Sequence, residues 1–252
     1  MADYQRNLSL YVEDSQVAAG CRINLSAREV LSILPALHHV TIQDLSDLSI
    51  ASLSEGRSLQ VRSDDFVICS GTITEVYTHI VSGKKLTSVV FSPQLSLWNA
   101  SVSFSVPSGM PVRTTIEKIL ENSGTGLPLA GYAADNPALL RPQAFFGRAA
   151  DALSVFAEMA DADIFIGPAG VIVSGRNQKT PVTRIQESAL LSEPIPVGKS
   201  LILSTIAVGL PLGTVAETEW KGMSYTGRIV SSFIQADNVS GPWKTELELE
   251  LV

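Results

Sequence analysis

The sequence predicts an α+β protein that is mainly β, with two β-barrel-like domains and a small α/β domain inserted between them. Apolar and polar residues alternate with a period of two through most of the first hundred residues and again at the C-terminal end. Apolar residues at helical spacing appear between residues 112 and 160. Clusters of Ser, Asp and Gly separate the alternating segments, as in turns between short strands. We therefore expect domains at residues 1–108, 109–178 and 179–252.

Residues 1–108 carry the pattern of a domain built from short strands. Leu8, Leu10 and Val12 alternate with polar neighbours, which is typical of a half-buried strand. Val81-Ser82-Gly83-Lys84 predicts a hairpin turn between two longer strands. The further strands are expected at residues 23–25, 40–42, 59–61, 66–69, 72–80, 86–91 and 102–106.

Residues 109–178 change to a helical pattern. Val112, Ile116, Ile119 and Leu120 share one face of a helix that Gly124 is placed to end. A long loop is expected over residues 124–142, and a second helix begins near residue 147. A tight hairpin follows over residues 163–173.

Residues 179–252 return to β. The segment 200–216 has no charged residue, but Gly209, Pro211 and Gly213 interrupt it. Two buried strands joined by a turn explain this segment better than a membrane helix, so no membrane insertion is expected. A final hairpin is expected from residues 228–234 and 243–252, and no fixed-period repeat is visible.

Three carboxylates line one face of the last expected strand. Glu246, Glu248 and Glu250 alternate with the apolar Leu247 and Leu249. Like charges along one strand face repel each other unless cations or a positive partner lie opposite. The strip is therefore either a solvated face or a polar surface for a partner or a channel.

The composition limits the classes of function. Apolar residues make up 45% of the chain and charged residues 17%, compared with about 25% charged in average domains. Such a surface is partly covered by neighbours, or it belongs to a large β core with Ser/Thr-rich loops. The net charge of −7 and the scattered basic residues argue against a nucleic-acid binder. An acidic wall would let DNA pass without specific binding.

Motifs for catalysis, cofactors and metals are not expected. Gly198-Lys199-Ser200 resembles the end of a phosphate-binding loop, but Glu193 stands where the first glycine should be. The adjacent His38 and His39 would point to opposite faces of a strand, which is a poor arrangement for one metal.

The remaining polar candidates have plain structural explanations. The pair Asp64-Asp65 reads as a turn, and Asp161 and Asp163 read as solvated charges between a helix and a strand. Cys21 and Cys69 imply no disulfide framework. The first residues lack the apolar core of a signal peptide, so synthesis in a reducing cytoplasm is expected.

The order of the segments resembles the baseplate and tail hub proteins of phages and related contractile injection systems. The stretch "SDDFVICSGTITEV" resembles a barrel segment of that family, and "VRTTIEKILENSG" resembles the helix that leads into its middle domain. The stretch "ALSVFAEMADADIFIGPAGVIV" resembles its helix followed by a hairpin. The ending "GRIVSSFIQADNVSGPWKTELEL" resembles its last barrel hairpin, with Trp243 and Thr245 in the closing strand.

The resemblance implies a structural virion protein, made in the host cytoplasm and located in the tail baseplate, and not an enzyme. It implies a homotrimer whose two related tube-type barrels per chain form a six-fold-like ring. That ring would join the tail tube protein to a trimeric spike protein, contact other baseplate proteins and line the DNA channel. Glu246, Glu248 and Glu250 are candidates for the polar wall of that channel.

Three alternatives stay open on the sequence. A hexameric distal-tail or adaptor ring protein would share the β-barrel pattern. A small cell-wall hydrolase would have Asp64, Asp65 or His39 in its site. A carbohydrate-binding β-module would be expected to carry more aromatic residues than the 6% present.

Overall fold

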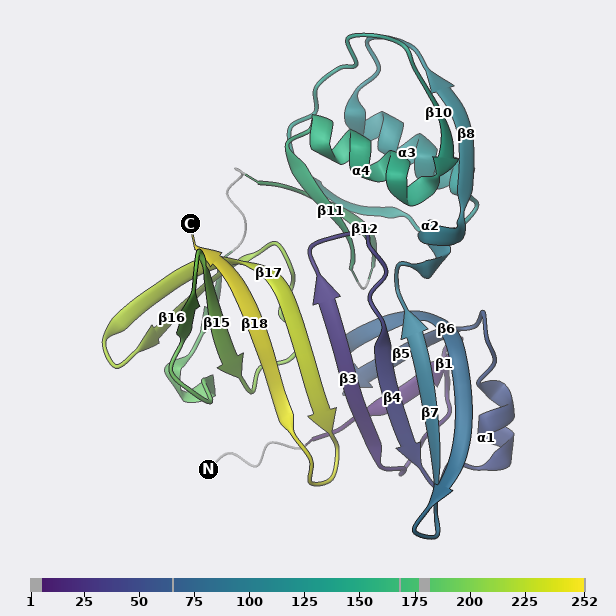
Figure 1. Cartoon of the computed structure of the whole chain (residues 1–252), viewed down its shortest axis with the longest axis vertical. Helices are drawn as coiled ribbons and strands as arrows, with labels where there is room; N and C mark the ends of the chain where they lie inside the picture. Colours follow the sequence, from purple (N-terminus) through teal and green to yellow (C-terminus); the bar gives the residue numbers. More distant parts are fainter. Residues whose placement is uncertain (1–5, 65, 168, 177–181, 252) are drawn as a thin grey trace. The chain divides into compact units, whose positions relative to one another are not determined.

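The computed structural model describes residues 6–64, 66–167, 169–176 and 182–251, and it is mainly β, with 53% strand and 15% helix (Figure 1). The chain forms two compact units. The first contains the described residues up to Glu29, the segment Ala36–Pro93 and the described residues from Val182 onward. The second contains Val30–Pro35 and the described residues from Gln94 to Arg176. The expected three-domain division at residues 108 and 178 stays a prediction.

The first unit holds most of the strands. Its elements are β1 (Ser9–Val12), β2 (Ser15–Gln16), β3 (Ile23–Val30), β4 (His38–Gln43), α1 (Asp47–Ser52), β5 (Ser58–Ser63), β6 (Phe66–Val81), β7 (Lys84–Ser92), β13 (Val182–Ile185), η1 (Glu187–Ala189), β14 (Ile195–Val197), β15 (Ser200–Thr205), β16 (Val215–Trp220), β17 (Met223–Asp237) and β18 (Trp243–Leu251).

These strands form one 13-stranded sheet. Its order is β14-β15-β18-β17-β3-β4-β7-β6-β5-β1-β2, and β16 pairs with both β17 and β13 (Figure 1). The expected barrels are not closed, because no pairing joins β14 to β2 among the described residues. Those end strands have three and two residues, which leaves little backbone for a closing ladder. One isolated bridge, Leu190 to Thr205, ties the segment after β13 to β15.

The expected strands of the first unit are confirmed, with one difference in pairing. The turn Ser82-Gly83 joins β6 to β7 as predicted, and both residues have positive φ. The uncharged segment 200–216 contains β15 and the start of β16, but these strands pair with β18 and β17 instead of with each other. In the described part of the chain, no helix is long and apolar enough to cross a membrane.

Two strand triplets of this sheet share one pairing pattern. In each, a long strand pairs first with one neighbour and then with another: β6 pairs with β5 and then β7, and β17 pairs with β16 and then β18. Gly71 and Gly227 stand at the two crossover points. A Cβ atom at Gly71 would lie 2.5 Å from the carbonyl carbon of Ser92, and one at Gly227 would lie 2.8 Å from Cβ of Leu249. Both crossovers therefore need the close backbone approach that glycine allows.

The match between the triplets continues residue by residue. A bulge follows Ile73 in β6 and Ile229 in β17, each two residues after the glycine. When β6 is matched to β17 in this way, Thr87 of β7 takes the same place as Thr245 of β18. Both threonines are completely buried. Phe91 and Val89 of β7 likewise align with Leu249 and Leu247 of β18, and all four are completely buried. The first unit therefore contains an internal structural repeat.

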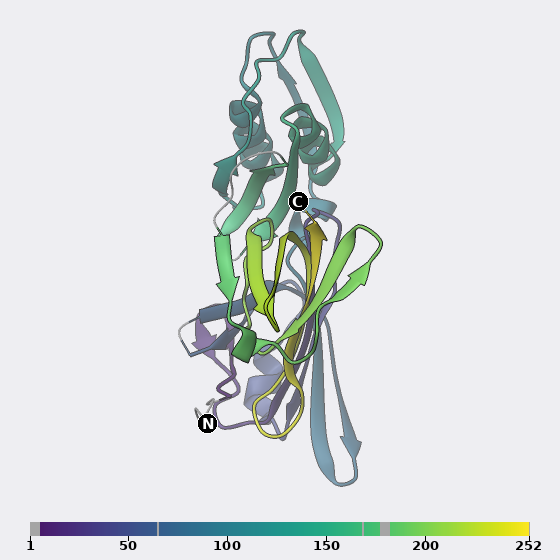
Figure 2. The same cartoon turned by 90° about the vertical axis from the view of Figure 1, so that its left-hand side faces the viewer.

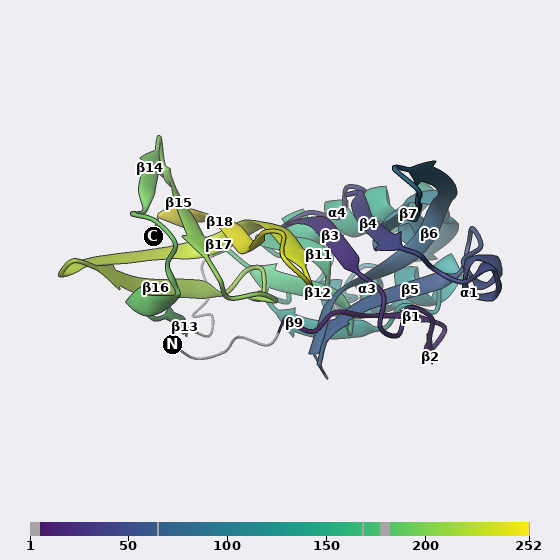
Figure 3. The ribbon, with the colours of Figure 1, turned by 90° about the horizontal axis from the view of Figure 1, so that it is seen from below.

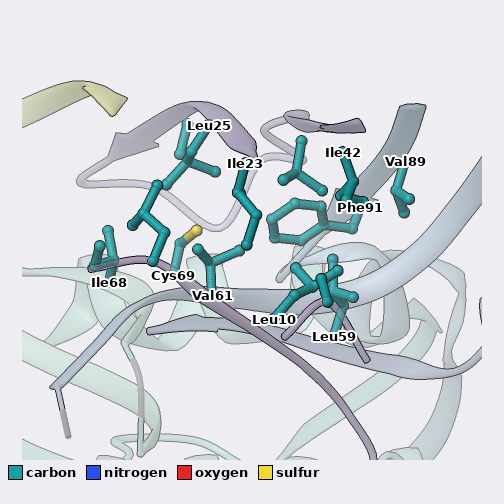
Figure 4. Packing of buried hydrophobic residues seen from close by; sticks show 14 of the residues in the cluster. Leu10, Ile23, Leu25, Ile42, Leu59, Val61, Ile68, Cys69, Val89 and Phe91 are labelled. Carbon is teal, nitrogen blue, oxygen red and sulfur yellow. The ribbon is translucent and has the colours of Figure 1, made fainter. Parts of the chain in front are cut away.

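The core of the first unit is formed by the inward faces of these strands. Leu10, Ile23, Leu59, Val61 and Phe91 are completely buried in it (Figure 4). Each side chain of this kind stabilises the fold by about 1.5–3 kcal/mol relative to an exposed position. The period-two alternation of the sequence thus corresponds to one buried face of the sheet.

The second unit is the expected α/β part. Its elements are α2 (Leu95–Asn99), β8 (Ser101–Val106), α3 (Val112–Ser123), β9 (Leu129–Ala133), β10 (Gln143–Arg148), α4 (Ala149–Met159), β11 (Ala162–Gly167) and β12 (Gly170–Gly175).

Both helices of this unit agree with the predicted faces, and α3 ends at Gly124 with φ of 66°. Two expectations are corrected. The stretch expected as a loop over residues 124–142 contains β9, which is parallel to β12. In addition, β8 pairs with β10 in this unit instead of joining the N-terminal strands. Small residues such as Ala130 and Gly131 hide the alternation of β9, so the sequence pattern missed it.

Candidate assembly surfaces

The acidic strip of β18 lies on the side of the strand opposite the core. Glu246 and Glu248 are half-buried and Glu250 is exposed, whereas Leu247 and Leu249 between them are completely buried. The side chain of Lys244 donates to Glu246 with an Nζ–Oε1 distance of 2.6 Å. The hydroxyl of Ser200 donates to Glu248 at 3.2 Å. The strip is thus partly compensated, which reduces the repulsion between its carboxylates.

A hollow of about 320 Å³ lies beside this strip. Its lining combines the acidic Glu246 and Glu248 with the apolar Ile202 and Phe233 and the basic Arg28. These residues come from four strands that are neighbours in the sheet, β15, β18, β17 and β3. Such a mixed, open depression suits contact with another protein surface better than enclosure of a small molecule.

The end of the long hairpin carries an open sheet edge. β5 pairs with β6 only as far as Thr72, while β7 pairs with β6 as far as Val81 (Figure 2). Beyond Ile73, β6 has no strand on its other side among the described residues. Ile80 is 76% exposed, and Tyr77 and Val81 are about half exposed. Long apolar edges of this kind are sites for pairing with another chain.

A second open edge lies at the β14 end of the sheet. β14 and the short segment around Leu190 cover the outer side of β15 (Figure 3). Leu191, Ile195 and Val197 on this segment are each more than half exposed. Both open edges therefore expose apolar side chains.

A polar seam links β3 to the turn between β17 and β18. Arg22 donates to Oδ2 of Asp237 from two nitrogens, at 3.1 and 2.8 Å. Oδ1 of Asp237 accepts from the backbone N–H groups of Val239 and Ser240, and Asn24 donates to Oδ2. Burial would raise the pKa of the Asp237 carboxyl, but these hydrogen bonds hold it well below its usual range. The seam holds the two halves of the repeat together.

The two adjacent histidines occupy opposite faces of β4, as predicted. His38 is completely buried and stacks on Phe91 with ring centroids 5.1 Å apart, whereas His39 is exposed. Neither ring nitrogen of His38 has a hydrogen-bond partner among the described residues. Burial, with a smaller effect of His39, lowers the pKa of His38 to about 4. In the repeat, Leu201 occupies the place of His38, so the position is apolar in character.

The carboxylates suggested for a hydrolase do not converge in the described structure. Asp64 is in a turn with φ of 51° and accepts from Asn7, while Asp65 lies outside the described residues. Asp161 and Asp163 both face Arg176, at 3.8 and 3.0 Å. Both belong to an ion-pair cluster, but Asp161 is exposed as the sequence suggested, and only Asp163, which is half-buried, departs from the expected solvated charge.

The remaining motifs are also structural. The Gly198-Lys199 pair forms the turn between β14 and β15, so no helix follows it to hold a phosphate. Within the described residues, no group of three or more His, Cys, Asp and Glu side chains is placed to hold a metal ion. Cys21 and Cys69 are both free thiols.

The open edge of β6 was not predicted from the sequence, and the repeat was implied only by the resemblance to proteins with two related barrels, not by a visible residue pattern. Two signals were present in the sequence. The spacing Gly71-x-Ile73-x-x-x-Tyr77 recurs as Gly227-x-Ile229-x-x-x-Phe233. The predicted strand before the hairpin turn was also much longer than its predecessor, which leaves part of one edge without a partner.

No protein-family model matches the sequence, and no curated protein matches it either. Solved structures do match over nearly the whole chain. The tail protein from Neisseria meningitidis has a TM-score of 0.68 and 14% identity, covering 96% of this chain and 95% of its own. The 43 kDa tail protein of prophage MuSo2 from Shewanella oneidensis has a TM-score of 0.72 and 8% identity, covering 97% and 96%.

A third similar structure comes from a secretion system. It is an E. coli component of the type VI secretion system that exhibits structural similarity to the T4 bacteriophage tail proteins gp27 and gp5. Its TM-score is 0.65 at 9% identity, and the match covers 96% of this chain and 76% of the other. Identities this low compare folds only. The chain has the fold of these phage tail proteins and of this type VI secretion component, which confirms at the level of the fold the resemblance to the baseplate proteins of phages and contractile injection systems.

Proposed function

We propose that this chain is a structural component of a phage-type tail baseplate, and specifically its central hub. In this role it forms a homotrimer that joins the tail tube to a trimeric spike and contacts other baseplate proteins. The mature location is the virion tail, after synthesis in the host cytoplasm. The proposal uses no catalytic step.

The observation that carries this proposal is the open sheet of the first unit. It has two open edges that expose apolar side chains, Ile80 on the distal part of β6 and Ile195 on β14. An edge that is left unpaired in water promotes aggregation, so natural proteins cover such edges with a partner. A ring of identical chains covers both edges at once, because each chain presents one edge to each neighbour. The tail proteins with the same fold support a tail role for such a ring.

The acidic strip has a role in this proposal as part of the channel wall. Glu246, Glu248 and Glu250 would face passing DNA and repel its phosphates, so that DNA slides without specific binding. Replacing all three by Gln should slow DNA ejection from assembled particles. Normal ejection by that variant would remove the strip from the channel wall while leaving the hub proposal in place.

Electron microscopy of particles that contain the chain tests the hub role. An antibody against the chain should label the end of the tail tube, next to the spike. Label along the whole tube would contradict the hub, and label at the tube end with six copies per ring would favour an adaptor ring instead.

A further inference from the structure

The internal repeat indicates what covers the open edge of β6. In the second half of the repeat, the distal part of β17 has β18 on one side and β3 on the other. In the first half, the corresponding part of β6 has β7 on one side and nothing on the other among the described residues. The same structural position is thus covered once within the chain and left open once.

The burial of matched residues shows the difference directly. By the two registers, Ile80 corresponds to Ala236 and Thr78 to Ile234. Ala236 and Ile234 are completely buried, whereas Ile80 is 76% exposed and Thr78 is also exposed. A strand lying beside β6, in the place that β3 takes beside β17, would bury this edge in the same way.

The backbone of β6 is available for such a strand. Val81 and Lys84 flank the two-residue turn and face each other across the hairpin. The alternation of the antiparallel ladder then turns the N–H and C=O groups of Thr78 and Ile80 away from β7. These groups point toward the side that no described strand occupies.

The repeat also identifies the strand that would fit. β4 and β15 correspond, because both pair with the matched strands β7 and β18. β3 lies on the outer side of β4, and the segment from Leu190 to β14 lies on the outer side of β15. That segment is the counterpart of β3, and no described strand lies on its own outer side.

We propose that the distal part of β6, residues 74–81, pairs with the segment 190–197 of a second copy of this chain. The contact repeats the one between β17 and β3 within the chain, so it needs no new type of surface. It is heterologous, since two different edges of the sheet meet, and it builds a ring when the rotation between neighbouring chains closes. The proposal rests on the proposed function and adds to it the two segments that form the subunit contact.

Pro196 limits how this contact can grow. Val197 and Ser200 flank the turn between β14 and β15, so the backbone of Pro196 faces the outer side. Proline has no N–H group to donate there, which makes this edge a poor template for unlimited strand addition. Its carbonyl oxygen remains available to accept from an N–H group of β6.

The first test compares two exposed apolar residues of the same unit. Ile80→Lys places a charge on the proposed contact, and Leu48→Lys places the same charge on α1, where Leu48 is 87% exposed. Light scattering after size exclusion should show at least a tenfold loss of association for Ile80→Lys and no loss for Leu48→Lys. Both variants should keep the wild-type far-UV circular dichroism spectrum, because neither residue is buried in the single chain.

The second test is a cross-link between the two segments. Thr78→Cys and Ile195→Cys are combined in a Cys21→Ser background and treated with a short thiol cross-linker. The double variant should give covalent oligomers up to the size of the ring, and each single variant should stay a single chain on a denaturing gel. Cross-linking of Thr78→Cys alone would show two-fold pairing of β6 with itself and would overturn the proposal.

The two tests separate this contact from the hub role. A wild-type trimer that is unaffected by Ile80→Lys and gives no cross-link would overturn the contact and leave the hub in place. A cross-linked ring of six chains would support the contact and contradict the trimeric hub. A wild type that stays monomeric and uncross-linked at every concentration would overturn both.

Discussion

Replacement of Asp237 should destabilise the fold more than removal of any single exposed ion pair of the first unit. Its carboxylate is the common acceptor for Arg22, Asn24 and the backbone N–H groups of Val239 and Ser240. Only 2% of the Asp237 side chain is exposed, whereas Arg22 keeps 39% exposure. The substitution Asp237→Ala removes all of these bonds at once.

The magnitude follows from the burial of the two partners. Hydrogen bonds to a charged group contribute about 1.5–3 kcal/mol each, and breaking a buried ion pair costs about 3–5 kcal/mol. Because the partly exposed Arg22 can regain water after the substitution, we expect the lower end, about 3 kcal/mol. Asp237→Asn should cost slightly less, since its oxygen can still accept from Val239 and Ser240.

The assay is urea unfolding followed by circular dichroism at neutral pH. The matched control is Glu246→Gln, which removes the more exposed ion pair with Lys244 and should cost less than about 1 kcal/mol. The pH dependence adds a second readout. Because the pKa of Asp237 is depressed in the folded state, its contribution is present above about pH 4 and is lost as the pH falls below that value. A loss for Asp237→Ala no larger than for Glu246→Gln would refute the reasoning.

Three further predictions concern the core, the crossovers and the acid response. His38→Leu should raise the free energy of unfolding by about 1–3 kcal/mol at neutral pH, because it removes two buried nitrogens without partners; equal stability in urea would contradict this. The stability advantage of His38→Leu should widen as the pH falls from about 6.5 to 4, because the depressed pKa of His38 makes the wild type lose stability in that window. Acid titration of both proteins checks this. Comparing the two proteins cancels the opposite effect of Glu29, whose pKa burial raises to about 7. Gly71→Ala and Gly227→Ala should each lower the free energy of unfolding by about 1–3 kcal/mol, because the added Cβ would contact the neighbouring strand. Gly131→Ala, whose Cβ would lie 3.6 Å from Ile172, should change it by less than about 1 kcal/mol. Thermal unfolding distinguishes the three variants, and equal midpoints would argue against tight crossovers.

The parts of the fold that were predictable from the sequence depend on local patterns. The strip from Trp243 to Leu251 alternates strictly, and it forms β18 with Leu247 and Leu249 inward. The helix from Val112 to Ser123 and its end at Gly124 follow from side-chain spacing and backbone freedom alone. Local signals of this kind do not depend on which distant segment lies opposite.

The parts that were missed depend on long-range pairing. β8 alternates as clearly as the N-terminal strands, yet its partner is β10, and nothing within β8 specifies that choice. The closure of a barrel is likewise decided by the short end strands β2 and β14, whose lengths no periodicity reveals. Asp163 was read as solvated because its partner, Arg176, lies more than ten residues further along the chain.

The candidate surfaces divide in the same way. The acidic strip was visible because three glutamates recur at every second position, from Glu246 to Glu250. The edge of β6 was not visible, because exposure of Ile80 arises from the absence of a neighbouring strand and not from its own sequence. A repeat search with the Gly-x-Ile-x-x-x-aromatic spacing would have connected Gly71 with Gly227 and pointed to the uncovered strand.

The mass of the purified chain in solution tests the central claim most directly. Light scattering coupled to size exclusion, over a range of concentrations, reports the number of chains in the particle without a model of its shape. We predict a mass of three chains that persists on dilution, because the ring covers both open edges of each sheet. A stable mass of six chains, or of a single chain at every concentration, would contradict the trimeric hub.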